Sequence, residues 1–217
     1  AERMSESLRV SAQLTTVQQV DVTRIAALRA KAKAEFERRE GVKLTFLPFF
    51  AKAAIEALKA FPQVNASINE ETKEVTYHDS VHLAIAVDTP RGLIVPVIHD
   101  ADRKTLTEVA AEAHDLAARA RSGRLTLDEL AGGTFTLSNL GPYGIDHFTA
   151  VINPPQAAIL SVGAAKPQPV VKDGEVRPGV TMALTLSIDH RVLDGATGAA
   201  FLADLRSLLE QPLRIVV

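Results

Sequence analysis

The segment Asp189–Gly195, with the sequence DHRVLDG, holds the residue types best suited to chemistry. It follows the apolar stretch VTMALTLSI at 180–188, so polar groups stand where a buried strand would end. Proteins of the α/β class often place their sites at such strand ends, and the imidazole of His190 could act there as a general base near neutral pH. A structural alternative is equally open: Asp194 caps the last helix, Arg191 pairs with an acid, and His190 is merely buried.

A second candidate is the glycine-rich segment GGTFTLSNLGPYG at 132–144. Two glycines precede a short strand pattern that ends in Ser138 and Asn139, and a tight turn follows. A hydroxyl and an amide at a strand end could stabilise an oxyanion or bind substrate. Taken alone, however, the segment is better explained as an ordinary turn. The chain holds no P-loop, no dinucleotide-binding glycine fingerprint and no GxSxG nucleophile turn.

The remaining five histidines offer weaker candidates. His78 and His82 stand four residues apart in a strand pattern, where that spacing covers roughly 13 Å and is too long for one metal ion. We expect both to be surface strand residues. His114 belongs to an amphipathic helix and is expected in solvent. His99 and His147 lie in predicted loops, each beside an aspartate, and nothing in the local sequence distinguishes either as a base.

Composition excludes several functional classes. The length of 217 residues suits one domain over 1–217, and a net charge of -2 gives no basic field for nucleic acid or anionic lipid. The chain has no cysteine, which excludes disulfides, thiolate catalysis and cysteine metal sites and fits a reducing compartment. No apolar run approaches the ~18 residues of a membrane span. Without a basic field and without such a run, we expect neither nucleic acid nor a membrane as partner. Because the chain begins at Ala1 and not at a methionine, we expect a domain cut from a longer protein.

The elements that would position these residues predict an α/β fold with one mixed sheet and helices covering a face. Caps and helical spacing predict a helix from Asp21 to about 39, followed by helices at 45–59, 105–121, 126 onward and 196–210. Alternation and apolar runs predict strands in QLTTVQQVDV, through 75–97, in TFTLS, in AAILSVG and in VTMALTLSI, with a hairpin turning at Asp173-Gly174. Pro96 marks an edge or a bulge.

Beyond these local patterns, DHRVLDG closely resembles the signature of the dihydrolipoamide acyltransferases, the core subunits of 2-oxo acid dehydrogenase complexes. Four further segments resemble the catalytic domain of that family, in its order: FPQVNAS, AVDTPRGLIVPVIHDAD, GGTFTLSNLG and FTAVINPPQAAILSVG. The resemblance covers nearly all of 1–217. It implies a two-layer mixed sheet flanked by helices, similar to that of chloramphenicol acetyltransferase, and a homotrimer.

For the site, the resemblance implies that His190 is the general base, that Ser138 donates to the oxyanion and that Asp194 is a buried structural acid. It also implies that His190 and Ser138 act from different subunits. The Ser-Asn-Leu-Gly order looks more like acetyl or branched-chain acyltransferases than like succinyltransferases. One departure is SAQLTT at 11–16, where many members carry Pro-His near the coenzyme A entrance, so the residues that bind coenzyme A are not assigned.

The resemblance further implies the substrates and partners. Coenzyme A and a lipoyl group on a separate domain would be substrates, and no metal would be needed. The lipoyl and subunit-binding domains of the family are absent from this sequence, and through them 2-oxo acid dehydrogenase and dihydrolipoamide dehydrogenase subunits would bind. The apolar tail PLRIVV would join trimers into a cubic or icosahedral core. The expected location is the cytoplasm of a bacterium, or the mitochondrial matrix if the source is eukaryotic.

Four other functions remain as alternatives. A serine hydrolase would use Ser138 as nucleophile with His190 and Asp194, although Ser138 lacks the strained glycine turn of such nucleophiles. A structural core subunit would be expected to lack His190. An antibiotic O-acetyltransferase is less well matched by the DHR-type motif and GGTFTLSNLG. A branched-chain or succinyl-specific acyltransferase of the same family differs only in the acyl group.

Overall fold

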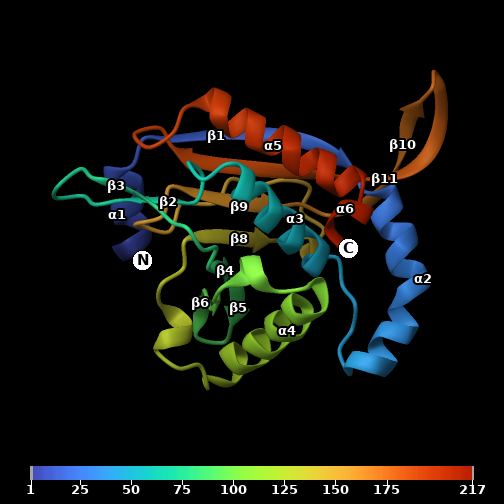
Figure 1. The fold of residues 1–217 in the computed structure, drawn as a ribbon, viewed down its shortest axis with the longest axis horizontal. Coiled ribbons are helices and arrows are strands. Elements are labelled where there is room, and N and C mark those ends of the chain that lie inside the picture. The colour runs from blue at the N-terminus through green and yellow to red at the C-terminus, as the bar shows by residue number, and fades with distance from the viewer. Residues whose placement is uncertain (1, 217) are drawn as a thin grey trace.

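A seven-stranded mixed sheet forms the centre of the computed structural model, which describes residues 2–216 (Figure 1). Its strands are β1 (Gln13–Asp21), β4 (Leu83–Ile85), β7 (Val97–Ile98), β8 (Phe135–Asn139), β9 (Ala158–Val162), β10 (Lys166–Lys172) and β11 (Glu175–Asp189). They lie in the order β1-β11-β9-β8-β4-β7, and β10 pairs with β11 off this path. β8 runs parallel to β9 and β4, whereas β11 runs antiparallel to β1, β9 and β10.

Helices cover one face of this sheet. The described helices are α1 (Glu2–Val10), α2 (Thr23–Glu40), α3 (Leu47–Ala60), α4 (Leu106–Ser122), α5 (Gly195–Glu210) and α6 (Leu213–Val216). α3 and α5 pack against each other in front of the strands, and α4 lies beyond β4 next to two small hairpin strands, β5 (Val87–Thr89) and β6 (Gly92–Ile94) (Figure 1). A further hairpin, β2 (Ala66–Ile68) with β3 (Val75–Tyr77), lies at the end of the molecule where α1 also lies. The predicted mixed sheet with helices over a face is confirmed.

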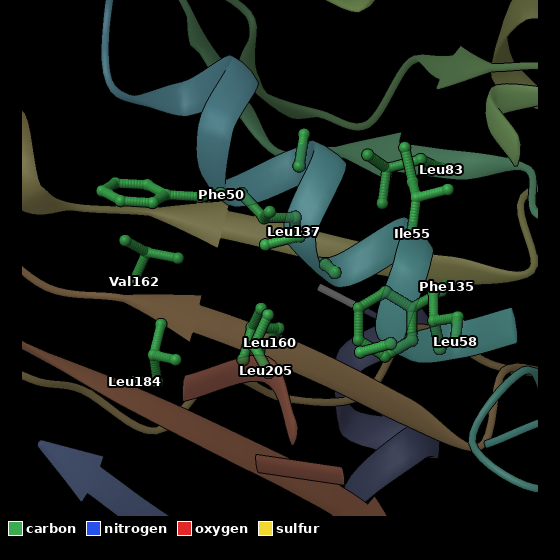
Figure 2. Close-up of a cluster of buried hydrophobic side chains, with 14 of the residues drawn as sticks. Phe50, Ile55, Leu58, Leu83, Phe135, Leu137, Leu160, Val162, Leu184 and Leu205 are labelled. Atoms are coloured by element: carbon green, nitrogen blue, oxygen red, sulfur yellow. The ribbon is translucent and has the colours of Figure 1, made fainter. Parts of the chain in front are cut away.

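The hydrophobic core is built on the alternation of side chains along β11. Leu184, Leu186 and Ile188 point toward the helices and belong to the aliphatic core, whereas Thr185 and Ser187 point to the opposite face. Figure 2 shows how Leu184, Leu160 and Leu137 from three adjacent strands meet side chains of α3 and α5. The opposite face of β11 is also buried, since Thr185 is 1% exposed. β11 is therefore enclosed on both faces, which explains its apolar run.

Local signals predicted several boundaries correctly. Thr105 and Glu108 form the expected capping box at the start of α4, and Gly123 ends that helix in the left-handed conformation. The hairpin turns at Asp173 and Gly174, both at positive φ (53° and 79°), as a two-residue turn of this kind requires. These signals act over three or four residues and need no tertiary support.

Other boundaries differ from expectation. α1 lies before β1, where no helix was predicted. Asp21 is the last residue of β1 and not the cap of α2: Val22 holds that position, and Asp21 instead accepts the N–H of Thr23 at 2.9 Å. The stretch 75–97 forms five short strands, because it must change partner three times among the central sheet and the two small hairpins. Thr126 and its glutamate open only one 3₁₀ turn, at 128–130.

The outer strand of the β10–β11 hairpin carries Pro167 and Pro169. Pro167 is paired with Val180, whose N–H bonds to Thr23 Oγ1 and whose carbonyl accepts the N–H of Val22. The polar backbone groups of Val180 therefore point away from β10. In an antiparallel ladder the backbone groups of the paired residue, Pro167, then point to the outer edge of β10. Pro169, two residues further along, has the same orientation, so both prolines stand where an N–H would otherwise point outward.

None of the described helices combines the length and the apolar character that a membrane span needs.

Asp194 is the N-cap of α5. Its Oδ1 accepts the N–H of Thr197 at 2.7 Å, and its extended backbone is that of a cap residue. This hydrogen bond lowers the pKa of the carboxyl below its ordinary value of 3.8, with a smaller contribution from nearby His190. Because the carboxyl has a lower pKa folded than unfolded, its stabilising contribution is present above pH 3.8 and is lost as the pH falls through the lower, folded pKa.

Replacing this cap is expected to separate its hydrogen bond from its charge. Asp194→Ala should lower the melting temperature at pH 7 by a few degrees, whereas Asp194→Asn should lose much less because asparagine also caps helices. The deficit of Asp194→Ala should shrink below about pH 3.8, as thermal unfolding followed by circular dichroism would reveal. Asp204→Ala, within the same helix, serves as the control and should not reproduce this pH dependence. Equal losses for the alanine and asparagine variants of Asp194 would contradict the capping role.

Candidate active site

His190 stands at the point where β11 leaves the sheet, and its side chain is exposed. Its backbone N–H donates to the carbonyl of Ala12, at 2.8 Å, in the link between α1 and β1. The residue is therefore held through its main chain while the imidazole is free to meet a ligand. The structural alternative for this segment was right about Asp194 and Arg191, but it is wrong about His190, which is not buried.

The two neighbours of His190 form an ion-pair network. Asp189 is 1% exposed, and its carboxylate accepts the N–H of Arg191 at 3.1 Å and the guanidinium of the same residue at 2.6 Å. The other side of that guanidinium binds both carboxylate oxygens of Glu70, at 2.8 and 3.0 Å. Arg191 lowers the pKa of Glu70 to about 2, and the two acids raise the pKa of Arg191. The sequence predicted an acidic partner for Arg191 but gave no signal for Glu70, which lies 121 residues away.

The expectation of a buried structural acid at Asp194 is not met within the single chain. Asp194 is exposed, and its described hydrogen bond runs to the N-terminus of α5 and not to the ring of His190. The residue orders the first turn of the helix that follows the motif.

Ser138 lies at the carboxyl end of β8 and is half-buried. It is in register with Ser161 of β9, which is in turn opposite Thr185 of β11, so three hydroxyl side chains form a row across the second face of the sheet. The hydroxyls of Ser161 and Thr185 are buried, and neither has a hydrogen-bond partner among the described residues. The oxyanion-donor candidate thus belongs to a polar strip beneath the surface.

Close backbone contacts fix the turn after Ser138. A side chain at Gly163 would place its Cβ 1.9 Å from the carbonyl oxygen of Asp146, and one at Gly141 would place it 2.8 Å from the carbonyl of Gly163. Asn139 accepts the N–H of Gly141 through its side chain at 2.9 Å. The glycines here allow the turn to pack directly on β9, which holds the end of β8 in place.

The register separates His190 from Ser138 within one chain. Ser138 is two strands away from Thr185, and His190 is five residues beyond Thr185 along β11. With a rise of ~3.3 Å per residue and ~4.8 Å between strands, the two Cα atoms are roughly 19 Å apart. Side chains of this length cannot both contact one carbonyl group across such a distance. A single chain therefore does not bring the two candidates together.

The other histidines do not form a second site. His78 and His82 lie in the loop between β3 and β4 and not in strands, as had been expected. His78 bonds Ser67 at 3.0 Å, and burial together with the charge of His82 lowers its pKa. The ring of His82 packs against His99, with centroids 5.1 Å apart. His114 is exposed on α4, as expected, and no cluster able to hold a metal ion occurs among residues 2–216.

Curated relatives are similar in sequence to this chain over almost its whole length. The acetyltransferase component of the pyruvate dehydrogenase complex from Mycobacterium bovis is 52% identical over 216 residues, covering 97% of this chain and 39% of the relative. The succinyltransferase component of the 2-oxoglutarate dehydrogenase complex from Haemophilus influenzae is 42% identical over 217 residues, covering 100% of this chain and 53% of the relative. The chain thus spans about half or less of the length of these relatives.

Solved structures agree with the fold. Two of them match with a TM-score of 0.94 and 40% identity, covering 100% of this chain and 88% of each: the cubic core of a pyruvate dehydrogenase multienzyme complex, and the dihydrolipoamide acetyltransferase of Azotobacter vinelandii. The latter work concerns the role of one serine, one histidine and one asparagine in the catalytic mechanism. Chloramphenicol acetyltransferase, at 16% identity and a TM-score of 0.60 over 96% of this chain and 94% of its own, confirms the fold.

The family model described as 2-oxoacid dehydrogenases acyltransferase (catalytic domain) matches residues 1–217. With the relatives above, this match shows that the chain belongs to the 2-oxoacid dehydrogenase acyltransferase family.

Proposed function

We propose that this chain transfers an acyl group, most readily acetyl, between the dihydrolipoamide of a lipoyl domain and coenzyme A. The reaction is a thioester exchange with His190 as general base and Ser138 as oxyanion donor. We further propose that copies of the chain form the core of a 2-oxo acid dehydrogenase complex. The membership in the family and the arrangement of the two side chains support both parts.

Residue spacing supports the assignment of the site. In the Azotobacter vinelandii enzyme, the serine, histidine and asparagine studied for catalysis are separated by 52 and 4 residues. Ser138, His190 and Asp194 have the same two separations in this chain. Asp194 thus stands where that enzyme has asparagine, and both residue types can cap a helix.

The observation that carries the proposal is the separation of roughly 19 Å between Ser138 and His190. Two residues of complementary chemistry at opposite ends of one sheet become useful together when a second copy brings its His190 to this Ser138. A cyclic trimer would repeat this contact three times and leave no unmatched surface of that kind. We therefore place the active site between neighbouring copies.

In this reaction one carbon–sulfur bond forms and another breaks, and the protein has to move one proton and stabilise one oxyanion. A thiol of pKa ~8.5 is mostly protonated at neutral pH, and His190 removes its proton as the sulfur attacks the carbonyl carbon of the other thioester. The carbonyl oxygen becomes an oxyanion and accepts a hydrogen bond from Ser138. When the tetrahedral intermediate collapses, the carbon–sulfur bond of the original thioester breaks, and the imidazolium gives the proton to the departing thiolate. The acyl group thus passes from one sulfur to the other and the proton passes in the opposite direction, and no step requires a metal.

The hydrolase alternative is less well supported by the same geometry. A Ser-His-Asp triad needs the base within hydrogen-bond reach of both the serine and the orienting acid. The described hydrogen bond of Asp194 is made to the N–H of Thr197 and not to the ring of His190, so the orienting acid of such a triad is lacking in this chain. The half-buried Ser138, packed in a row of hydroxyls, is suited to donate a hydrogen bond and is poorly placed as an exposed nucleophile.

The acyl group and the partners follow from the relatives as part of this proposal. The Mycobacterium bovis relative favours acetyl, with succinyl and branched-chain groups as alternatives. A lipoyl domain on another part of the protein would deliver the dithiol, and the 2-oxo acid dehydrogenase and dihydrolipoamide dehydrogenase subunits would bind through domains outside this segment. Because these relatives are bacterial, we propose the cytoplasm of a bacterium as the location.

Removing either side chain should slow acyl transfer to dihydrolipoamide. His190→Ala should lower the rate by roughly 10²–10⁴-fold, the range expected for loss of a general base. Ser138→Ala should lower kcat by ~10²–10³-fold with little change in KM for coenzyme A, because the hydroxyl acts on the transition state. Acetyl-, isobutyryl- and succinyl-coenzyme A, offered in turn to the parent enzyme, should give the highest kcat/KM with acetyl. A near-parental rate for His190→Ala, or covalent labelling of Ser138 by a serine-directed probe, would contradict the mechanism.

Mixing the two inactive variants should restore activity if the site lies between copies. After dissociation and reassembly at equal amounts, a random trimer places an intact His190 beside an intact Ser138 at about one interface in four. We therefore expect up to about a quarter of the parental rate, measured against each variant reassembled alone. Differently tagged subunits would verify the mixing. Mixed trimers without recovered activity would place both residues in one site of a single chain.

The C-terminal tail differs from its predicted form. Ile215 is 2% exposed and belongs to the chain's own core, whereas Leu213 is 69% and Val216 40% exposed. Val217 lies outside the described residues. Leu213 borders an open, mainly apolar hollow formed with Arg24 of α2 and the end of α5. We propose that Leu213, and not Ile215, joins trimers into larger cores, as a cubic core is known for a relative.

A single substitution tests this role better than deletion of the tail, because a deletion would also remove the buried Ile215 and could destabilise the chain. Leu213→Glu should leave trimers and their melting temperature unchanged while abolishing larger particles in light scattering. Leu127→Glu, at a side chain that is 84% exposed elsewhere, is the matched control and should leave the large particles intact. Large particles that persist with Leu213→Glu would refute the role of the tail.

A further inference from the structure

The segment that carries His190 is held by contacts on both sides of that residue. Its own N–H bonds to the carbonyl of Ala12, and the next N–H, of Arg191, bonds to the carboxylate of Asp189. The carbonyl of Asp189 also accepts the N–H of Val192 at 2.9 Å. The direction in which the imidazole leaves the chain is therefore set by the peptide groups around it. Any group that fixes Arg191 also fixes this direction.

Glu70 is the outer support of Arg191. The guanidinium of Arg191 donates from its Nε edge to Asp189 and from its outer edge to both oxygens of Glu70, so hydrogen bonds on two edges restrict its rotation. Asp189 alone would hold the Nε edge and leave the far nitrogen to solvent. Lys73 contacts Glu70 at 3.2 Å, so the carboxylate remains charged and oriented within its turn.

The turn that presents Glu70 is itself anchored to the sheet region. Ile68, two residues earlier, donates its N–H to the carbonyl of Pro155, and Asn69 donates to Glu74 across the β2–β3 turn. β2 is also bridged to Gln156, whose side chain accepts a hydrogen bond from the buried Thr136, two residues before Ser138 in β8, at 2.6 Å. Glu70 therefore stands on a framework that is continuous with the strand bearing the oxyanion donor.

We propose that Glu70 is a positioning residue for His190 and acts through Arg191. The inference rests on the proposed role of His190 as general base. Glu70 contacts no reacting atom in this arrangement: it fixes the guanidinium, the guanidinium fixes the peptide that follows His190, and that peptide fixes the imidazole. A base that wanders by about 1 Å can cost ~10²-fold in rate, so a support of this kind affects the chemical step more than substrate binding.

The test compares neighbouring glutamates on the same turn. Glu70→Ala should lower kcat by roughly 5- to 30-fold with KM for coenzyme A and for dihydrolipoamide within about twofold, whereas Glu70→Gln, which keeps one acceptor oxygen, should lose less. Glu71→Ala is the matched control, because Glu71 is exposed and only its backbone N–H makes a described contact there. In an Arg191→Lys background, lysine can pair with Asp189 but cannot bridge both acids, so Glu70→Ala should cause no further loss.

A second readout does not depend on activity. Hydrogen exchange followed by mass spectrometry should show faster exchange at 189–192 in Glu70→Ala trimers, with the interior of α5 unchanged. Parental kcat in Glu70→Ala, equal losses in Glu71→Ala, or a lower kcat without faster exchange would each overturn the inference. If His190→Ala instead retained activity, the proposed function would fail, and exchange at 189–192 would still decide whether Glu70 holds the segment.

Discussion

Antiparallel pairing of β11 with β9, next to parallel pairing of β9 with β8, sends the ends of β11 and β8 to opposite edges of the sheet. The positions of both candidate residues, His190 and Ser138, depend on that arrangement. The base candidate leaves the sheet at one edge, and the oxyanion-donor candidate lies near the other. Since strand spacing cannot be compressed, no movement of side chains closes the gap. In the function proposed above, the sheet would hold two half-sites, and a second copy of the chain would complete each of them.

Each half-site is built by a different physical device. At the end of β8, glycines allow backbone to touch backbone, and the turn is fixed by the absence of side-chain volume at Gly141 and Gly163. At the end of β11, an ion pair fixes the backbone: the buried carboxylate of Asp189 is compensated by Arg191. Arg191 also binds Glu70 of the β2–β3 hairpin, which is remote in the sequence. A buried acid without such a partner would cost several kcal/mol. The ion pair is therefore a condition for ending a core strand in Asp189.

The features predicted from the sequence are those determined over short distances. The capping box of α4, the hairpin at Asp173-Gly174 and the apolar strand before His190 all depend on neighbours within a few residues. The resemblance to a family supplied the role proposed for His190, because periodicity alone left that residue undecided between a base and a structural residue. What could not be predicted depends on contacts between remote segments, such as the pairing of Glu70 with Arg191 or the burial of Ile215. The exposure of Asp194 also belongs here, because whether a loop residue is covered depends on what packs above it.

Pro167 and Pro169 give the projecting hairpin a property that its shape alone would not suggest. An outer strand with free N–H groups is a template on which other chains can add strands, which is a common route to amyloid-like aggregation. Here two of the outward donors are missing, so the edge cannot be extended by a regular ladder. A particle built from many copies holds such edges at very high local concentration. In the multi-copy core proposed above, the prolines would prevent strand pairing along the outer strand of this hairpin, and the exposed side chains of Val171 and Val176 near its tip would be its contact points.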